Sequence, residues 1–287
     1  MNIRSALETY RYWNAQREVF SAHAPKVDQA MRKSELARMR LDYEAVARAM
    51  QDDGVFAIES YWPEDKCSKG REEIDRLIST YPDSVHRHSG GSDKRMFGVE
   101  SASPLLAEFH NDPFLRAVGE HLGGLALYNF ATLGARIDAT PENNGSGDGW
   151  HRDAHGFQFK SILYLSDVTK ENGPFEFLPA SHKQWRAVFD TAVGDLPAAP
   201  VTRYEPVVVD RIVKRFRLRR TQFTGKAGTL LLVNTSGIHR GCPLQAGSRY
   251  ALTNYFYHPF QVGESRVEKF APLVPGTAER IRADFPE

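Results

Sequence analysis

Residues 228–257 read GTLLLVNTSGIHRGCPLQAGSRYALTNYFY and contain two segments typical of β-strands. Residues 229–233 are apolar and partly β-branched, and residues 250–257 are rich in aromatic side chains, so both favour an extended backbone. Further segments of this kind follow Gly124 at residues 126–137, 157–165, 175–178 and 213–218. Because many short strands without intervening helices must pair into a sandwich or closed barrel, the sequence predicts a mainly β fold of the jelly-roll type.

The region before Gly124 has a different pattern, in which apolar residues recur at helical spacing among many charged residues. An exception is the short apolar run at residues 55–58, which favours a buried strand. We expect the helices to pack outside the β core. The predicted organisation is one domain, residues 1–287, with a largely helical support at 1–124 and a jelly-roll core at 125–262.

Composition narrows the classes of function. The 287 residues are 41% apolar and 25% charged with a formal net charge of +1, which gives no reason to expect a nucleic-acid partner. The N-terminal residues have no apolar core of signal-peptide length, and no apolar run approaches a membrane span. Two cysteines fit a reducing compartment, so we expect a cytoplasmic protein. The oligomeric state is not indicated.

A metal-binding pattern occurs in the sequence GWHRD, where His151 precedes Asp153 by two residues. In an extended strand these side chains point to the same face, so both can reach one ion. His239 follows the apolar run at residues 229–233 and is the candidate for a third ligand. Two histidines and a carboxylate suit Fe(II) and leave coordination positions open. Ten residues later, Arg249 begins a predicted strand, where its guanidinium could bind a dicarboxylate.

Each of these residues alone has an ordinary interpretation, since a His-x-Asp pair is often a surface feature and an arginine at a strand end is usually solvated. Their joint placement on successive strands is much less common by chance. Two other functions stay open at this point. A zinc-dependent hydrolase on a cupin-like barrel could use the same three ligands, and a non-catalytic jelly-roll binding module could retain them without activity. Arg249 distinguishes the hydrolase, which needs no dicarboxylate clamp.

Several motifs resemble the phytanoyl-CoA dioxygenase family of Fe(II)/2-oxoglutarate-dependent oxygenases. They are WHRDA at residues 150–154, KENGPFEFLPASHK at 170–183, GTLLLVNTSGIHRG at 228–241 and SRYALTNYFY at 248–257. The similarity runs from about Tyr128 to Phe260. It gives no alignment to a CoA-binding surface, so the family name does not identify the substrate.

The resemblance implies a double-stranded β-helix in which His151, Asp153 and His239 bind Fe(II) and Arg249 binds 2-oxoglutarate. It also implies a dioxygenase that uses O2 to hydroxylate, or otherwise oxidise, a small-molecule substrate with release of succinate and CO2. If Arg249 were not the clamp, Arg136 or Lys160 would be the next candidates.

Other residues are candidates by position. The segment at residues 126–137 should face the barrel, which makes Asn129 and Thr132 candidate co-substrate contacts and Arg136 a candidate substrate contact. His155 shares strand parity with His151 and could line the substrate pocket. The polar residues at 86–94 are expected to form a mobile lid.

A long insertion at residues 182–225 is expected to lie near the barrel mouth as a lid. Its second half is rich in arginine. One interpretation is an edge strand in which Arg217 and Arg219 alternate with apolar residues and face solvent. The other is that Arg217 and Arg219 face the active-site opening and attract an anionic substrate.

Overall fold

The computed structural model describes residues 2–37, 42–88, 92–141, 143, 145, 149–194 and 196–286. Within these residues the strands form two antiparallel sheets, one of seven strands and one of five. The larger sheet has the order β1 (Val55–Ile58), β10 (Leu230–Asn234), β6 (Phe159–Tyr164), β12 (Ser248–Tyr257), β4 (Tyr128–Asp138), β3 (Asp93–Phe97) and β2 (His86–His88). The smaller has the order β8 (Arg203–Tyr204), β5 (Trp150–His151), β11 (His239–Gly241), β7 (Phe175–Phe177) and β9 (Thr221–Phe223).

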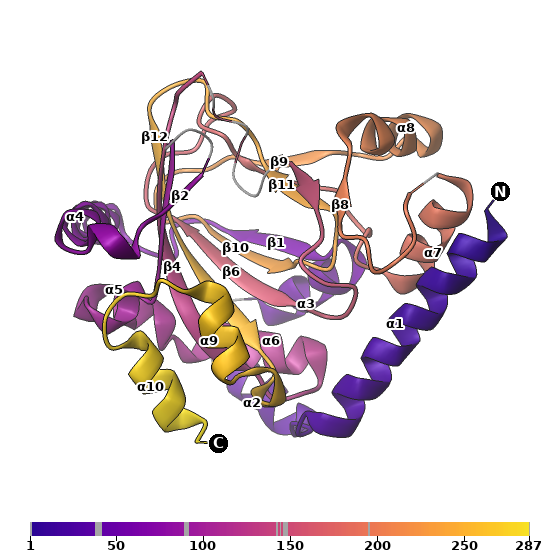
Figure 1. Ribbon diagram of the computed structural model, residues 1–287, viewed down its shortest axis with the longest axis horizontal. Helices are drawn as coiled ribbons and strands as arrows, with labels where there is room; N and C mark the ends of the chain where they lie inside the picture. Colours follow the sequence, from indigo (N-terminus) through magenta and orange to yellow (C-terminus); the bar gives the residue numbers. More distant parts are fainter. Residues whose placement is uncertain are drawn as a thin grey trace.

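The two sheets face each other, as in a double-stranded β-helix (Figure 1). The predicted jelly-roll fold is therefore confirmed, and β1, β4, β6, β7, β10 and β12 lie where the sequence predicts strands. Strand β10 contains most of the apolar run of residues 229–233 that the sequence shows most clearly. All five of its residues are buried, because β1 and β6 flank it and both of its faces are covered.

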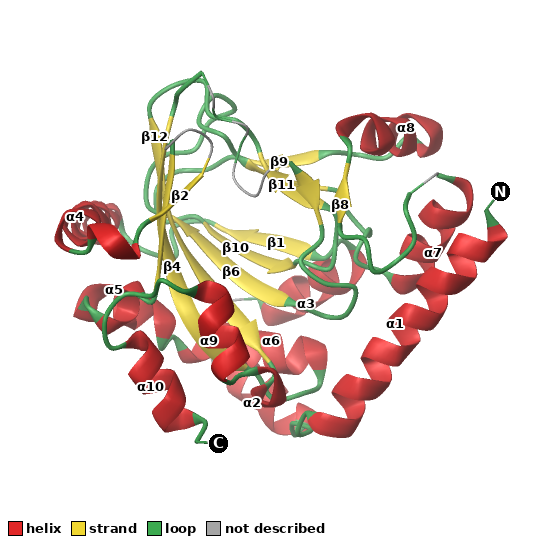
Figure 2. Cartoon of the chain, viewed as in Figure 1, coloured by secondary structure: helices red, strands yellow, loops and turns green. Residues whose placement is uncertain are grey.

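Helices precede the β core, as predicted. They are α1 (Ile3–His23), α2 (Gln29–Ala37), α3 (Tyr43–Asp52), α4 (Glu64–Thr80), α5 (Pro104–His110) and α6 (Pro113–Gly123). Helices α3, α5 and α6 lie beneath the larger sheet (Figure 2), where residues such as Val46, Leu106 and Leu115 join one apolar core with Leu232 and Leu252. This core packs the larger sheet against the helical layer.

Further helices lie outside this layer. Helix α1 packs along α7 (Gln184–Val193) at one side of the molecule (Figure 1). Helix α8 (Pro206–Phe216) belongs to the same region of the chain as α7, and α9 (Glu264–Phe270) and α10 (Thr277–Asp284) follow β12. Short 3-10 helices occur at Pro82–Ser84, Val99–Ser101 and Pro259–Gln261. No helix in the described ranges is long and apolar enough to cross a membrane.

The insertion differs from the expected edge strand. Residues 206–216 form α8, with Pro206 in its first turn and Arg217 ending it in a left-handed conformation, φ 50°. Val209 and Ile212 are fully buried in a cluster with Trp150. The edge-strand interpretation is wrong because tertiary burial of this helical face overrides the strand preference of its β-branched residues.

The expected lid at residues 86–94 is also different. Strands β2 and β3 pair as an antiparallel hairpin that extends the larger sheet, with His86 opposite Arg95. The ring of His86 contacts the carbonyl oxygen of Pro272 at 3.0 Å. Residues 89–91 lie outside the described part of the chain. The described residues 86–88 and 93–94 therefore belong to a sheet edge rather than a free loop.

Candidate metal centre

The metal centre is built on the pairing of β5 with β11, which places His239 directly opposite His151. Asp153 lies two residues beyond His151, so its side chain returns to the same face. The Nδ1 atom of His151 is 2.8 Å from the Gly149 carbonyl oxygen, and that of His239 is 2.9 Å from the Gly237 carbonyl oxygen. If each Nδ1–H donates to its carbonyl, each Nε2 keeps a free lone pair for a metal.

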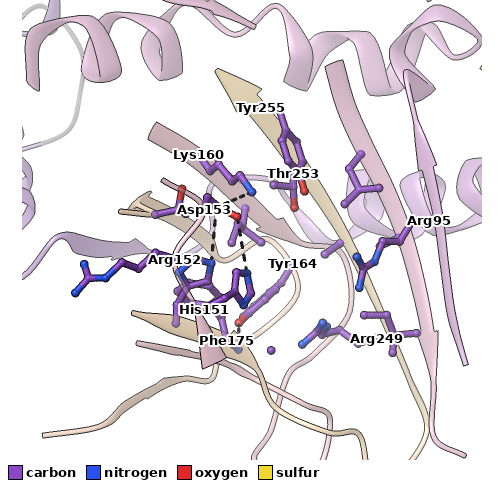
Figure 3. A pocket seen from close by; sticks show the side chains of 18 of the residues that line it. Arg95, His151, Arg152, Asp153, Lys160, Tyr164, Phe175, Arg249, Thr253 and Tyr255 are labelled. Carbon is purple, nitrogen blue, oxygen red and sulfur yellow. Dashed lines mark hydrogen bonds and ion pairs between the residues drawn. The ribbon is translucent and has the colours of Figure 1, made fainter. Parts of the chain in front are cut away.

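The three side chains converge on one point, and Figure 3 shows His151 beside Asp153. Asp153 Oδ1 lies 3.8 Å from His151 Nε2, and Asp153 Oδ2 lies 3.7 Å from His239 Nε2. All three ligand atoms lie within 4.8 Å of one another, and in the part of the chain that the structure describes no other group of His, Cys, Asp or Glu does so. This is the donor set of a two-histidine, one-carboxylate site.

The charges at this centre suit a divalent cation. Burial lowers the pKa of His239 to about 3 and also lowers the pKa of His151, so both rings are neutral at pH 7. Burial alone would raise the pKa of Asp153, but the neighbouring charges, of which Lys160 is the largest, together with the hydrogen bond from Lys160 outweigh it and hold that pKa well below its usual range. Two neutral imidazoles and one carboxylate are the protonation states that metal ligation requires.

Arg152, between two of the ligands, points to the opposite side of the strand (Figure 3). It is 2% exposed, and its Nε donates to the Tyr204 hydroxyl at 3.0 Å. Its guanidinium also donates to the carbonyl oxygens of Ser181, at 2.6 Å, and Ser236. Arg152 therefore ties the ligand-bearing segment to three other parts of the chain.

Arg249 begins β12 and lines the same cavity, whose volume is about 330 Å³. It is 6% exposed, and its Nε has no hydrogen-bond partner among the described residues. Burial lowers its pKa, yet an arginine stays charged in proteins. A buried guanidinium with an unused donor fits an anionic ligand, so the residues present fit a dicarboxylate beside the metal.

The structure places two predicted co-substrate contacts outside this cavity. Asn129 donates to the His110 carbonyl oxygen at 2.9 Å, and Thr132 donates to Asn254 Oδ1 at 2.6 Å. Both therefore lie on the helix-facing side of β4. The register with β12 steps from Ala131 to Asn129 at one position, and this bulge moves Asn129 to the same face as Thr132. Their assignment as co-substrate contacts is wrong for this structure.

The predicted substrate contacts are also elsewhere. Arg136 forms ion pairs with Asp75, at 2.9 Å, and Asp138, at 3.0 Å, on the outside of the sheet. The Nδ1 of His155 accepts a hydrogen bond from Trp13 of α1 at 3.1 Å, away from the metal. Arg217 and Arg219 are exposed and do not line the cavity.

Arg203 and Arg95 are cavity residues that the sequence analysis did not identify. Arg203 comes from β8, where it pairs with His151, so the insertion does bring an arginine to the site, although a different one from those expected. Arg95 comes from β3 and forms an ion pair with Asp93. No local signal identifies either residue, because both reach the cavity through long-range strand pairing.

Comparisons with known proteins agree with this geometry. The family model described as Phytanoyl-CoA dioxygenase (PhyH) matches residues 50–247. An ectoine dioxygenase of Nocardia farcinica is 25% identical over 248 residues, covering 78% of this chain and 79% of that protein. An L-proline trans-4-hydroxylase of Streptomyces griseoviridis is 25% identical and covers 70% of this chain and 83% of its own.

Solved structures show the same fold. The epimerase SnoN, in complex with Fe3+, alpha ketoglutarate and nogalamycin RO, has a TM-score of 0.62 at 16% identity, covering 82% of this chain and 90% of that chain. EctD from S. alaskensis with bound Fe has a TM-score of 0.60 at 18% identity, covering 77% of this chain and 78% of that chain.

The first prediction concerns the ligands. Changing His151, Asp153 or His239 to Ala should abolish stoichiometric Fe(II) binding, because each change removes one of three donors. The bound iron is measured after anaerobic loading, and circular dichroism checks that the domain stays folded. His155→Gln is the matched control and should keep full iron binding. Full iron occupancy in any of the three alanine variants would contradict the assignment.

Proposed function

The chain belongs to the phytanoyl-CoA dioxygenase family and is an Fe(II)- and 2-oxoglutarate-dependent dioxygenase, and we propose that it hydroxylates, or otherwise oxidises, a small anionic molecule. The observation that carries the proposal is that one cavity holds both the His-Asp-His cluster and a buried arginine with an unused donor. The three-residue cluster alone would fit several metals. The buried guanidinium of Arg249 in addition needs an anion to pair with, and that anion would lie beside the metal.

The division of roles follows from the geometry. His151, Asp153 and His239 would hold the iron, and Arg249 would bind the far carboxylate of 2-oxoglutarate. Iron with this co-substrate supplies the oxidising chemistry, in which O2 is consumed and succinate and CO2 are released. The chain's own residues supply orientation and exclusion of water. The apolar side chains of Ile162 and Phe175 line the cavity beside the charged groups and limit solvent there.

The two alternative functions are not favoured. A zinc hydrolase activates water and needs no buried cation reserved for a second carboxylate. A binding module without activity would have no reason to keep neutral histidines and an ionised aspartate converging on one point. In this chain the metal ligands and Arg249 share one cavity. An oxygenase that binds a dicarboxylate uses all of them.

The charge of the cavity supports an anionic substrate. Apart from Arg152, whose guanidinium points away (Figure 3), its lining includes four cationic side chains and one carboxylate, that of Asp153. Fe(II) and the 2-oxoglutarate dianion add charges that cancel, so the excess positive charge remains when both are bound. Arg249 is then used by the co-substrate and Arg152 by backbone carbonyls. Arg203, which pairs with His151 across β5 and β8, is the residue we propose for the substrate's acidic group.

Location and organisation complete the proposal. Cys67 and Cys242 are buried free thiols, and burial raises the pKa of each to about 11, so both fit a reducing cytoplasm. We propose a single catalytic domain in which the helical support and the insertion both serve the jelly-roll site. Ectoine and L-proline, the small molecules in the names of two relatives, indicate the molecular size to include in a substrate screen.

Substrate-dependent succinate release tests the proposed reaction. The protein, loaded anaerobically with Fe(II) and 2-oxoglutarate, should show a weak visible charge-transfer band. Admission of O2 with a library of small acidic metabolites should then give succinate above the background rate for the true substrate. Asp153→Ala is the inactive control. Absence of both the band and any 2-oxoglutarate binding would rule out the proposed function.

Arg249 should determine the affinity for 2-oxoglutarate. Arg249→Ala should weaken binding by about 2–5 kcal/mol, because a buried charge-assisted pair is lost. Arg249→Lys should recover only part, since an ammonium cannot reproduce the two parallel hydrogen bonds of a guanidinium. Calorimetric titration measures both. Arg136→Ala, an arginine on the outside of the sheet, is the control. Wild-type affinity for 2-oxoglutarate in Arg249→Ala would mean that another cavity arginine, Arg95, binds the co-substrate carboxylate.

Arg203 should control the KM for the substrate. Arg203→Ala should raise KM more at low salt than at high salt, because salt screens the lost attraction. Arg217→Ala and Arg219→Ala lie outside the cavity and should leave KM unchanged. The measurement is initial rate against substrate concentration at two ionic strengths. A neutral preferred substrate with unchanged KM in Arg203→Ala would refute the anionic class and leave the iron chemistry intact.

A further inference from the structure

Lys160 is a buried lysine in the middle of β6, between β10 and β12, where it pairs with Val233 and Tyr255. It is 8% exposed. Alternate residues of the strand, Lys160, Ile162 and Tyr164, line the cavity. An apolar residue would fit this position in a core strand, so the lysine requires an explanation.

The ammonium group has two partners. Its Nζ lies 2.8 Å from Asp153 Oδ2 and 4.0 Å from the centre of the Tyr255 ring (Figure 3). A buried ammonium is costly unless it is paired, and here a carboxylate and an aromatic face supply the pairing. The lysine is therefore a fixed cation directed at one metal ligand.

The two oxygens of Asp153 have different surroundings. Oδ1 lies 3.8 Å from His151 Nε2, and Oδ2 lies 3.7 Å from His239 Nε2. Each oxygen therefore faces one imidazole nitrogen, so both could reach a shared metal. Oδ2 is the oxygen that Lys160 contacts. The ammonium would compete with the metal for Oδ2, which leaves Oδ1 as the oxygen that the metal takes.

We propose that Lys160 is a positioning residue that keeps Asp153 a single-oxygen ligand of the iron. The inference rests on the proposed function. With one oxygen from Asp153, the three-residue cluster fills three positions of a six-coordinate ion and leaves three for the co-substrate and O2. A second Asp153 oxygen on the ion would close one of these positions. By holding Oδ2, Lys160 preserves the open site that the oxygenase reaction needs.

Lys160 could instead serve the substrate, as a cation for its acidic group. The two roles differ in what they change when no substrate is present. A substrate-binding lysine alters KM alone. A lysine that positions Asp153 alters the metal centre itself, including its spectrum before any substrate is added.

The experiment compares three lysine variants in the folded, metal-loaded protein. Lys160→Met is similar in length but neutral, and Lys160→Arg keeps a charged donor. Lys94→Met is the matched control, because Lys94 also pairs with a carboxylate, Asp138 at 2.7 Å, but does not line the cavity. Co(II) titration and the Fe(II)–2-oxoglutarate charge-transfer band are recorded without substrate, and kcat and KM are measured afterwards.

We expect Lys160→Met to bind Co(II) at least as tightly as wild type, because a repelling charge is gone, but to shift the Co(II) spectrum and the charge-transfer band. Its kcat should fall about 10–100-fold, as for other residues that orient a metal ligand, with a smaller effect on KM. Lys160→Arg should restore the spectrum, and Lys94→Met should match wild type. If Lys160→Met does not fold, Lys160→Gln is used, since its shorter neutral amide also removes the charge.

Wild-type spectra and kcat in Lys160→Met would overturn the inference, and a raised KM with unchanged spectra would assign Lys160 to the substrate instead. Failure of the proposed function is distinguishable from both outcomes. In that case the wild-type protein itself would show no charge-transfer band with Fe(II) and 2-oxoglutarate.

Discussion

The antiparallel pairing of β5 with β11 is the contact on which the metal centre depends, because it sets His151 and His239 face to face. Strand β5 has only two residues, and so short a strand has little stability of its own. Its position is fixed from outside. The Arg152 amide donates to the Thr202 carbonyl oxygen at 2.8 Å, and the Asp153 amide donates to the Thr235 carbonyl oxygen at 2.9 Å. Together with the Arg152 side chain, these bonds hold the ligands in place before a metal binds.

The electrostatic arrangement follows from burial. Histidines in this setting lose their protons, whereas Asp153 keeps its charge because Lys160 lies beside it. Arg249 has no such partner for its Nε in the described residues. Keeping a guanidinium buried costs free energy that only an anion recovers. The site therefore carries a preformed attraction for carboxylates.

Strand β4 shows how one element serves two environments. Its cavity face presents apolar residues such as Leu133 and Ala135, which leave room for ligands. Its other face contacts His110 of the helical layer, whose carbonyl oxygen accepts from Asn129 and whose ring lies 3.0 Å from the Thr132 hydroxyl. Asn129 and Thr132 are thus structural, because the helical layer on that face presents the His110 carbonyl oxygen and the buried Glu100, which need partners.

The sequence by itself determined the features that depend on local period. Enrichment in apolar, β-branched and aromatic residues identified six of the twelve described strands. The i, i+2 spacing put His151 and Asp153 on one face, and the apolar run before His239 marked the third ligand. Arg249 followed from its place at the start of a strand. These predictions needed only the geometry of one extended segment, and the structure brings all four residues to one cavity.

Only the tertiary structure decided the rest, because it depends on contacts between segments far apart in the chain. The bulge in β4 reversed the face of Asn129, and burial against Trp150 made residues 206–216 a helix. Arg203 reaches the cavity because β8 pairs with β5, and Lys160 meets Asp153 because β6 lies opposite the smaller sheet. Strand parity and pairing partners are set by long-range hydrogen bonding and burial, which no local pattern encodes.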